Sequence, residues 1–106
     1  MNLQEYKSTI IPSVTVIIPV YNEERSIEYC ISSLRKQSIP LEIIVVDDGS
    51  KDNSVKICED LGIKVLKQKH QGPGAARNLG ARSATGKILI LVDADMEFET
   101  YFVAKL

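Results

Sequence analysis

Short runs of aliphatic residues recur along this chain, and two of them, Val14–Ile18 and Glu42–Val46, are almost wholly apolar. Such runs are typical of strands that are covered on both faces, as in parallel sheets with helices on each side. Lys87–Val92 has the same character and indicates another buried strand, whereas Ile63–Leu66 is shorter and alternates with polar residues. We therefore expect four strands, with Ile63–Leu66 nearer an edge of the sheet.

The segments between these runs have the patterns of amphipathic helices. Asn22 is placed to cap a helix whose apolar stripe, Ile27–Leu34, follows the i, i+3, i+4, i+7 spacing. Asp52 or Asn53 is placed to cap a second, shorter helix. The third, Ala75–Ala84, is rich in small residues, which allow close packing of a helix on a sheet.

Strands that alternate with helices through short loops form β-α-β units, a parallel sheet and right-handed crossovers. We therefore predict an α/β fold, a parallel Rossmann-like sheet in three layers with the order 3-2-1-4 and the first strand central. The length of 106 residues fits a single domain, residues 1–106. The formal net charge of -1 gives no general attraction to nucleic acid, so no nucleic-acid partner is expected.

Polar residues follow three of the predicted strands at the edge where parallel sheets bind their ligands. The crevice beside the first strand is expected to collect Pro19–Glu23, Asp47–Asp48 and Asp93–Asp95 from three separate places in the chain. Clustered acids repel one another unless a cation or hydrogen bonds compensate them. This convergence is the strongest indication of function that the residues provide.

Asp93 and Asp95 face the same way in extended backbone, while Ala94 faces away and allows close approach of a ligand. Mg²⁺ and Mn²⁺ favour carboxylate and phosphate oxygens, so this spacing suits a hydrated cation that carries a diphosphate. We expect Asp95 to be the direct metal ligand. Asp93 would reach a ribose hydroxyl or a metal-bound water.

The other candidate residues each have a structural and a functional interpretation. Asp48 could accept a hydrogen bond from a base or ribose, and Asp47 could equally cap the following loop. Tyr21 could stack on a base or simply pack. Arg77, in the first turn of a helix, is placed to contact an anion or to form a salt bridge with one of these acids. His70 is expected to be a solvated loop residue, because the chain holds no second histidine.

Cys30 and Cys58 fall on apolar positions of predicted helices and have no spacing typical of metal ligands. We expect buried, reduced thiols and, by default, the cytoplasm or the cytoplasmic face of a membrane. Met1–Thr9 lacks the pattern of a signal peptide, and Val14–Tyr21 is too short to span a bilayer. A soluble chain is therefore expected.

Four motifs in order resemble the family 2 glycosyltransferases of the GT-A fold. They are Val16–Glu24, Glu42–Ser54, Gly72–Asn78 and Val92–Asp95, and together they extend over nearly the whole chain. The resemblance implies the N-terminal nucleotide-sugar-binding region of such an enzyme. It also implies a UDP- or GDP-sugar donor, bound through Mn²⁺ or Mg²⁺, and sugar transfer with inversion to an acceptor hydroxyl.

The resemblance also implies roles for individual residues. The nucleoside pocket would be lined by Pro19, Tyr21 and Glu23, and Asp48 would meet the base. Arg77 would lie near the base or diphosphate, Asp93 near the ribose and Asp95 on the metal.

The chain departs from this family in its extent, because family members are considerably longer. Inverting transfer needs a general base for the acceptor hydroxyl, and that carboxylate is expected beyond Leu106. We therefore expect a donor-binding region that is inactive alone, with no catalytic base of its own. Missing sheet neighbours would leave the fourth strand and the final helix incompletely covered, which predicts self-association or marginal stability, and membrane association of a longer parent protein is left open.

Three rival interpretations remain. A dinucleotide-binding Rossmann domain requires G-x-G-x-x-G after the first strand, but Pro19–Glu24 stands there. A phosphoacceptor signalling domain would be phosphorylated on Asp47 or Asp48. A non-catalytic nucleotide-binding or purely structural module is the third.

Overall fold

The computed structural model describes residues 1–3, 5 and 12–106, and within them four strands form one parallel sheet. The sheet has the order β3-β2-β1-β4, as predicted, with the first strand of the chain inside it. The strands are β1 (Val14–Val20), β2 (Leu41–Asp47), β3 (Lys64–Lys67) and β4 (Ile88–Leu91). β1 pairs with β2 along its whole length and with β4 over its first half, so it joins the two sides of the sheet.

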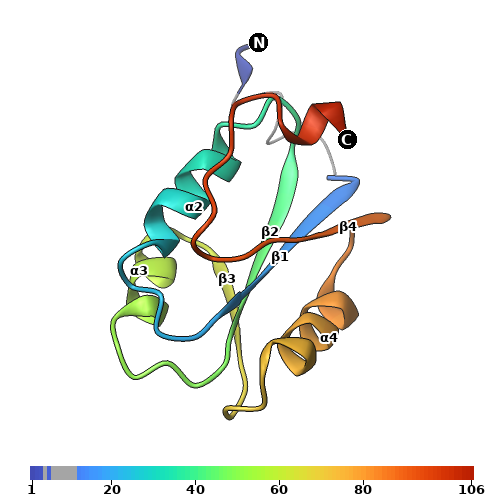
Figure 1. Cartoon of the computed structure of the whole chain (residues 1–106). Coiled ribbons are helices and arrows are strands. Elements are labelled where there is room, and N and C mark those ends of the chain that lie inside the picture. The colour runs from blue at the N-terminus through green and yellow to red at the C-terminus, as the bar shows by residue number, and fades with distance from the viewer. Residues whose placement is uncertain (4, 6–11) are drawn as a thin grey trace.

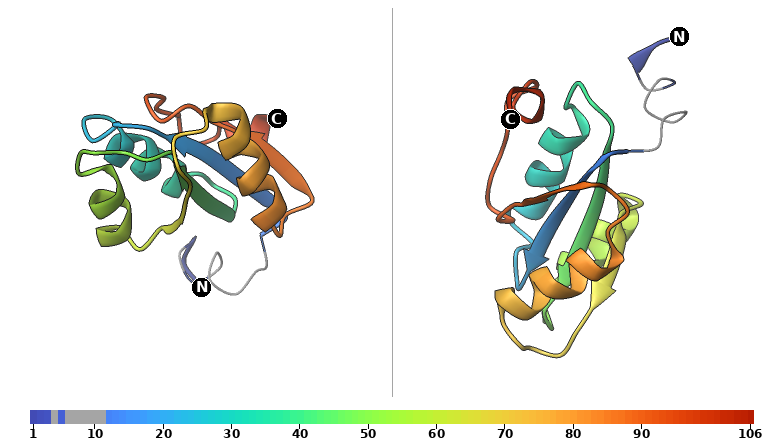
Figure 2. Two further views of the ribbon diagram at one scale, coloured as in Figure 1. Left: turned by 90° about the horizontal axis from the view of Figure 1, so that it is seen from below. Right: turned by 90° about the vertical axis from the view of Figure 1, so that its right-hand side faces the viewer.

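Helices cover both faces of the sheet, which confirms the predicted three-layer α/β fold. α2 (Ile27–Arg35) and α3 (Ser54–Asp60) lie on one face, and α4 (Pro73–Ser83) lies on the other (Figures 1 and 2). A short 3-10 helix, η1 (Val103–Lys105), follows near the C-terminus. Among the described residues, no helix has the length and apolar character needed to cross a membrane.

The central strand β1 is apolar throughout because it contributes to a hydrophobic core on each face. Val16, Ile18 and Val20 pack with α2 and with Cys58 of α3. Ile17, which points the other way, packs with residues of β2 and α4. Because successive side chains of a strand alternate between the two faces, a strand between two helical layers has no solvated side.

Small residues of α4 let this helix approach the sheet closely. Ala76 is fully buried, and a Cβ atom added to Gly80 would lie 2.5 Å from Ile17 Cγ2 and 3.2 Å from a methyl group of Val46. A real Cβ atom does not come that close to another carbon, so glycine is required at position 80. This contact confirms the close packing predicted for the small-residue helix.

We expect Gly80→Ala to lower the free energy of unfolding by about 1–2 kcal/mol, because the clash with Ile17 outweighs the higher helix propensity of alanine. Gly74→Ala, in the same helix, is the matched control, because an added Cβ there meets nothing within 4 Å. Its expected effect is a gain of about 0.5 kcal/mol. Urea denaturation of both variants measures the difference, and equal stability of the two would contradict the packing argument.

The start of α2 differs from the prediction that Asn22 caps this helix. Asn22 has a positive φ of 53° and lies outside the helix, which begins at Ile27. The backbone carbonyl of Glu23 instead accepts hydrogen bonds from the N–H groups of Ser26 and Ile27, forming a turn that leads into the helix. Asn22 was placed wrongly because its side chain bonds a different loop, as described below.

The segment after β4 runs back along α2 (Figure 1). The fully buried side chain of Gln37 fixes the C-terminal part of this segment. The Gln37 side-chain N–H donates to the Glu99 carbonyl at 2.6 Å, and the Gln37 side-chain oxygen accepts from Val103 N–H at 3.0 Å. Val103 itself is buried. A single polar side chain thus satisfies backbone groups of a segment more than sixty positions away.

β4 lies at an edge of the sheet and is exposed, so the prediction of a buried strand was wrong, whereas the expectation that the fourth strand is incompletely covered is confirmed. Ile88, Leu89 and Leu91 are 56%, 43% and 53% exposed. Within the described part of the chain only β1 pairs with β4, and α4 packs chiefly on β1 and β2 rather than on this strand. An aliphatic run therefore marks the strand correctly but does not reveal how much of it the rest of the chain covers.

We expect the chain to self-associate at high concentration, because exposed apolar edge strands are templates for pairing. Leu89→Lys and Leu91→Lys should reduce this association, since a lysine at an edge opposes pairing. Tyr29→Lys on α2, where the tyrosine is 63% exposed, is the control for an added charge elsewhere. Sedimentation velocity over a concentration series measures self-association. If all three variants self-associate to the same extent, the contact between copies does not involve β4.

Candidate functional site

A cavity of about 400 Å³ lies beyond the carboxyl ends of β1 and β2 and beside the loop that follows β4. It is where the sequence predicted a ligand crevice, between the first and fourth strands. The residues that line it are Pro19, Tyr21, Glu23, Asp48, Pro73, Asp93, Ala94 and Asp95. All of the predicted site residues except Arg77 are among them, and Pro73 of α4 is an addition that the sequence analysis missed.

Asp48 is buried at the cavity wall, and its carboxylate holds the loop between β3 and α4. Oδ1 accepts hydrogen bonds from the Gln68 amide at 2.8 Å and from Gln71 N–H at 2.7 Å, and Oδ2 accepts from Gly72 N–H at 3.0 Å. Burial alone would raise the pKa of this carboxyl, but the three hydrogen bonds outweigh it and hold the pKa below its ordinary value.

Asp47 points away from the cavity and closes the turn after β2. Its Oδ2 accepts hydrogen bonds from the N–H groups of Gly49 and Ser50 at 3.2 and 3.0 Å. The structure therefore favours the loop-capping interpretation of Asp47. Asp47 is buried and does not line the cavity, and both oxygens of Asp48 already accept hydrogen bonds, so neither is the free carboxylate that a phosphoacceptor domain requires.

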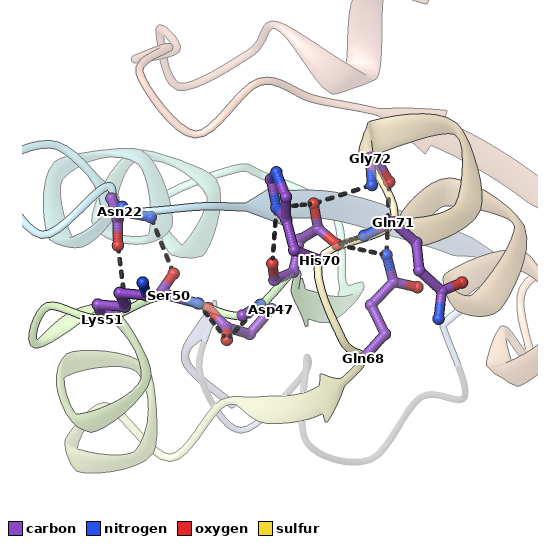
Figure 3. A network of polar contacts seen from close by, with 10 residues as sticks. Asn22, Asp47, Ser50, Lys51, Gln68, His70, Gln71 and Gly72 are labelled. Atoms are coloured by element: carbon purple, nitrogen blue, oxygen red, sulfur yellow. Dashed lines mark hydrogen bonds and ion pairs between the residues drawn. The ribbon is translucent and has the colours of Figure 1, made fainter.

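Side-chain hydrogen bonds join the loop after β1 to the loop after β2. The side-chain amide oxygen Oδ1 of Asn22 accepts from Lys51 N–H, and the backbone N–H of Asn22 donates to the Ser50 hydroxyl, both at 2.8 Å (Figure 3). Glu24 and Asp52 make a second reciprocal pair across the same gap: Asp52 accepts from Glu24 N–H, and Glu24 accepts from the N–H group of Asn53. The two loops that line the cavity are thus held as one unit, which explains the left-handed backbone at Asn22.

His70 is an exposed loop residue, as predicted, but it also contacts two residues of the cavity wall, which the prediction did not include. Its ring centroid is 4.3 Å from that of Tyr21, and its Nδ1 lies 3.1 Å from Asp48 Oδ2. The contact depends on how the ends of three strands meet, which the residues next to His70 do not reveal. The sequence indicates only that His70 lies just ahead of Gly72, in the connection that leads to the cavity.

Burial alternates along Asp93–Asp95 as predicted, with Ala94 buried and both acids exposed. The predicted extended backbone was wrong, because Met96 N–H donates to the Asp93 carbonyl at 3.1 Å and closes a turn. Val92 N–H donates to the Ile17 carbonyl, and Ala94 packs in the core beneath the cavity. The chain therefore presents two carboxylates on an anchored backbone, while the small side chain between them fills the interior.

Arg77 forms an ion pair with Asp93, and its Nη2 lies 4.0 Å from Asp93 Oδ1. Of the two interpretations offered for Arg77, the structure contains the salt bridge to one of the cavity acids. At 40% and 70% side-chain exposure, both partners are solvated, so the pair contributes little to stability and can be exchanged for another partner.

The acids fit a cation that brings its own phosphate ligands and do not form a closed metal site. Among the described residues, no cluster of three or more His, Cys, Asp or Glu side chains could hold a metal ion. Asp95 is exposed, and no described group donates a hydrogen bond to its carboxylate. Mg²⁺ and Mn²⁺ commonly take one or two carboxylates and complete their shell with substrate phosphates and water, which matches this donor set.

The two cysteines are free and fully buried, as expected. Burial raises the pKa of the Cys30 thiol to about 12 and that of Cys58 to about 11, with nearby carboxylates acting in the same direction. A thiol with a raised pKa is a poor nucleophile, so neither cysteine is a candidate catalytic residue.

The parallel sheet and its order are those of glycosyltransferases of the GT-A fold, and comparison with known proteins agrees. The model of the family described as Glycosyl transferase family 2 matches residues 15–106, and the chain belongs to this family. It is 41% identical over 90 residues to the putative glycosyltransferase EpsH of Bacillus subtilis (strain 168), covering 79% of this chain and 26% of EpsH.

Two solved structures share the fold over most of the chain. TarS 1-349 of S. aureus in complex with UDP is 32% identical, with a TM-score of 0.82 over 89% of this chain and 30% of that one. The mannosyltransferase PcManGT of Pyrobaculum calidifontis, in complex with GDP-Man and Mn²⁺, is also 32% identical, with a TM-score of 0.78 over 85% of this chain and 29% of that one. The chain thus spans under a third of the length of each of these relatives.

The hydrogen bonds of Asp48 predict an acid-dependent loss of stability. Because the pKa of Asp48 is lower in the folded than in the unfolded chain, its contribution is complete above the ordinary aspartate pKa of 3.8 and is lost as the pH falls through the folded value. We expect Asp48→Asn to be less stable than wild type at pH 7 and to lose less stability on acidification.

Denaturant unfolding at pH 7 and at a series of pH values below 4 measures both effects. Asp60→Asn, at a site that is 66% exposed, controls for the loss of one negative charge. An Asp48→Asn variant with the wild-type slope of stability against pH would contradict the assignment.

Proposed function

We propose that this chain is the donor-binding region of a family 2 glycosyltransferase and that it binds a UDP- or GDP-sugar in the cavity beyond β1 and β2. The observation that carries the proposal is the convergence of Pro19–Glu23, Asp48 and Asp93–Asp95 on one cavity of about 400 Å³. That volume lies in the range of pockets that hold small ligands. Relatives of the same fold in complex with UDP or GDP-Man support the choice of ligand.

The nucleoside would occupy the part of the cavity between Tyr21 and Asp48. Tyr21 is 41% exposed at the wall and offers a ring on which a base or ribose can pack. Pro19 and Glu23 complete this side. Asp48 would meet the base with Oδ2, which accepts one backbone hydrogen bond, from Gly72, whereas Oδ1 already accepts two, from Gln68 and Gln71.

The ribose and the diphosphate would lie toward Asp93 and Asp95. Asp93 would accept a hydrogen bond from a ribose hydroxyl, and Asp95 would bind Mn²⁺ or Mg²⁺ together with the diphosphate oxygens. Pro73, at the first turn of α4, places the positive end of the helix dipole beside this part of the cavity. Arg77 is close enough to Asp93 to exchange its present partner for a phosphate.

When bound, the cation would neutralise the charge that develops on the leaving diphosphate. The side chains themselves hold and orient the donor, and its position would expose the anomeric carbon to an acceptor from outside the cavity. Transfer with inversion also needs a general base, and each cavity acid already has a hydrogen-bonding, ion-pairing or metal-binding role. We therefore expect this chain to bind the donor without transferring the sugar.

We expect calorimetric titration to show binding of UDP or GDP in the presence of Mn²⁺ and at least tenfold weaker binding with a chelator, because the chain supplies too few ligands to hold the cation alone. Asp95→Ala should remove this metal dependence. Glu97→Ala is the control, because Glu97 is an exposed acid of the same segment that does not line the cavity. Nucleotide binding that is equally tight without metal would contradict the role of Asp95.

A further inference from the structure

His70 contacts two residues of the cavity wall that come from different strands. Tyr21 follows β1 and Asp48 follows β2, whereas His70 lies in the connection between β3 and α4. Its ring packs against that of Tyr21 at a centroid distance of 4.3 Å and an interplanar angle of 35°. Its Nδ1 lies 3.1 Å from Asp48 Oδ2 and 3.2 Å from the Asp48 carbonyl oxygen.

The backbone around His70 is packed as closely as its side chain. A Cβ atom added to Gly49 would lie 3.3 Å from the His70 backbone nitrogen, and Gly49 has a φ of 89°. Glycine at this position thus lets the loop after β2 approach the loop that carries His70. The position of the imidazole is therefore fixed by backbone contact as well as by its own two partners.

Stability alone does not explain the imidazole. The Asp48 carboxylate already accepts hydrogen bonds from Gln68, Gln71 and Gly72, so its burial does not require another donor. The His70 side chain is 64% exposed and adds little apolar burial to either core. What it does add is a direct link between the Tyr21 ring and the Asp48 carboxylate.

We propose that His70 is a positioning residue for the nucleoside and that it sets the spacing between the ring of Tyr21 and the carboxylate of Asp48. The inference rests on the proposed donor-binding function and adds to it a residue of the base-binding wall. A base held between these two groups requires a fixed distance between them, because ordering a mobile ring on binding reduces affinity. The diphosphate and metal part of the cavity, at Asp93 and Asp95, lies outside this link.

Two half-substitutions separate the two contacts of the imidazole. His70→Phe keeps a ring against Tyr21 but has no donor for Asp48, and His70→Asn keeps a donor but has no ring. His70→Ala removes both. Lys69→Ala, at the exposed neighbouring position, is the control for changes in the loop.

The experiment is calorimetric titration of these variants with UDP, with GDP and with inorganic pyrophosphate, all in the presence of Mn²⁺. We expect His70→Ala to weaken binding of the preferred nucleotide about tenfold, since a ring contact and a hydrogen bond each contribute a few-fold. His70→Phe and His70→Asn should each recover part of the loss. Pyrophosphate should bind all variants like wild type, because it reaches only the metal and phosphate part of the cavity.

The outcomes separate this inference from the function on which it rests. If wild type binds a nucleotide and His70→Ala binds it with the same affinity, the role of His70 is overturned and the proposed function is not. Equal weakening of nucleotide and pyrophosphate also overturns it, because that result indicates general loosening of the loop. A wild-type chain that binds pyrophosphate but neither nucleotide overturns the proposed function and the inference together. Thermal unfolding of each variant identifies any that does not fold, and the half-substituted variants then decide the question.

Discussion

The candidate site depends on one buried carboxylate. Asp48 directly follows β2, yet its carboxylate accepts hydrogen bonds from Gln68, Gln71 and Gly72 in the connection between β3 and α4. A buried acid is costly unless donors surround it, so the loop must wrap around this side chain for the chain to fold. The same wrapping sets where α4 begins, and with it the positions of Pro73 and Arg77 at the cavity. Asp48, a candidate ligand contact, therefore also holds the loop that leads to α4 in place.

Much of the fold and of the site could be predicted because both follow from the strands. Parallel strands deliver their carboxyl ends to one edge, so once β1, β2 and β4 were identified, the loops that follow them had to meet. The alternation in burial of Asp93, Ala94 and Asp95 was also correct, although a turn from Asp93 to Met96 replaces the extended backbone on which it was predicted. These inferences need only periodicity and chain direction.

The errors concern contacts between segments that are distant in the sequence. Asn22 has the residue type of a helix cap but bonds Lys51 and Ser50 across the cavity rim, and only the folded chain brings them together. The exposure of β4 depends on what covers it, which its own aliphatic residues cannot show. His70 was overlooked for the same reason, since its partners Tyr21 and Asp48 come from two other loops.

The strand order also has a consequence for how the chain folds as it leaves the ribosome. Of the four strands of the sheet, β1 is synthesised first, but one of its two neighbours is β4, so the ladder that pairs Val14 with Ile88 forms only after β4 has been made. Until then one edge of an almost wholly apolar strand has no partner, and non-local parallel pairing is slow. The strand that organises the finished sheet is thus the one exposed for longest during synthesis, and protection of nascent chains matters most at that stage.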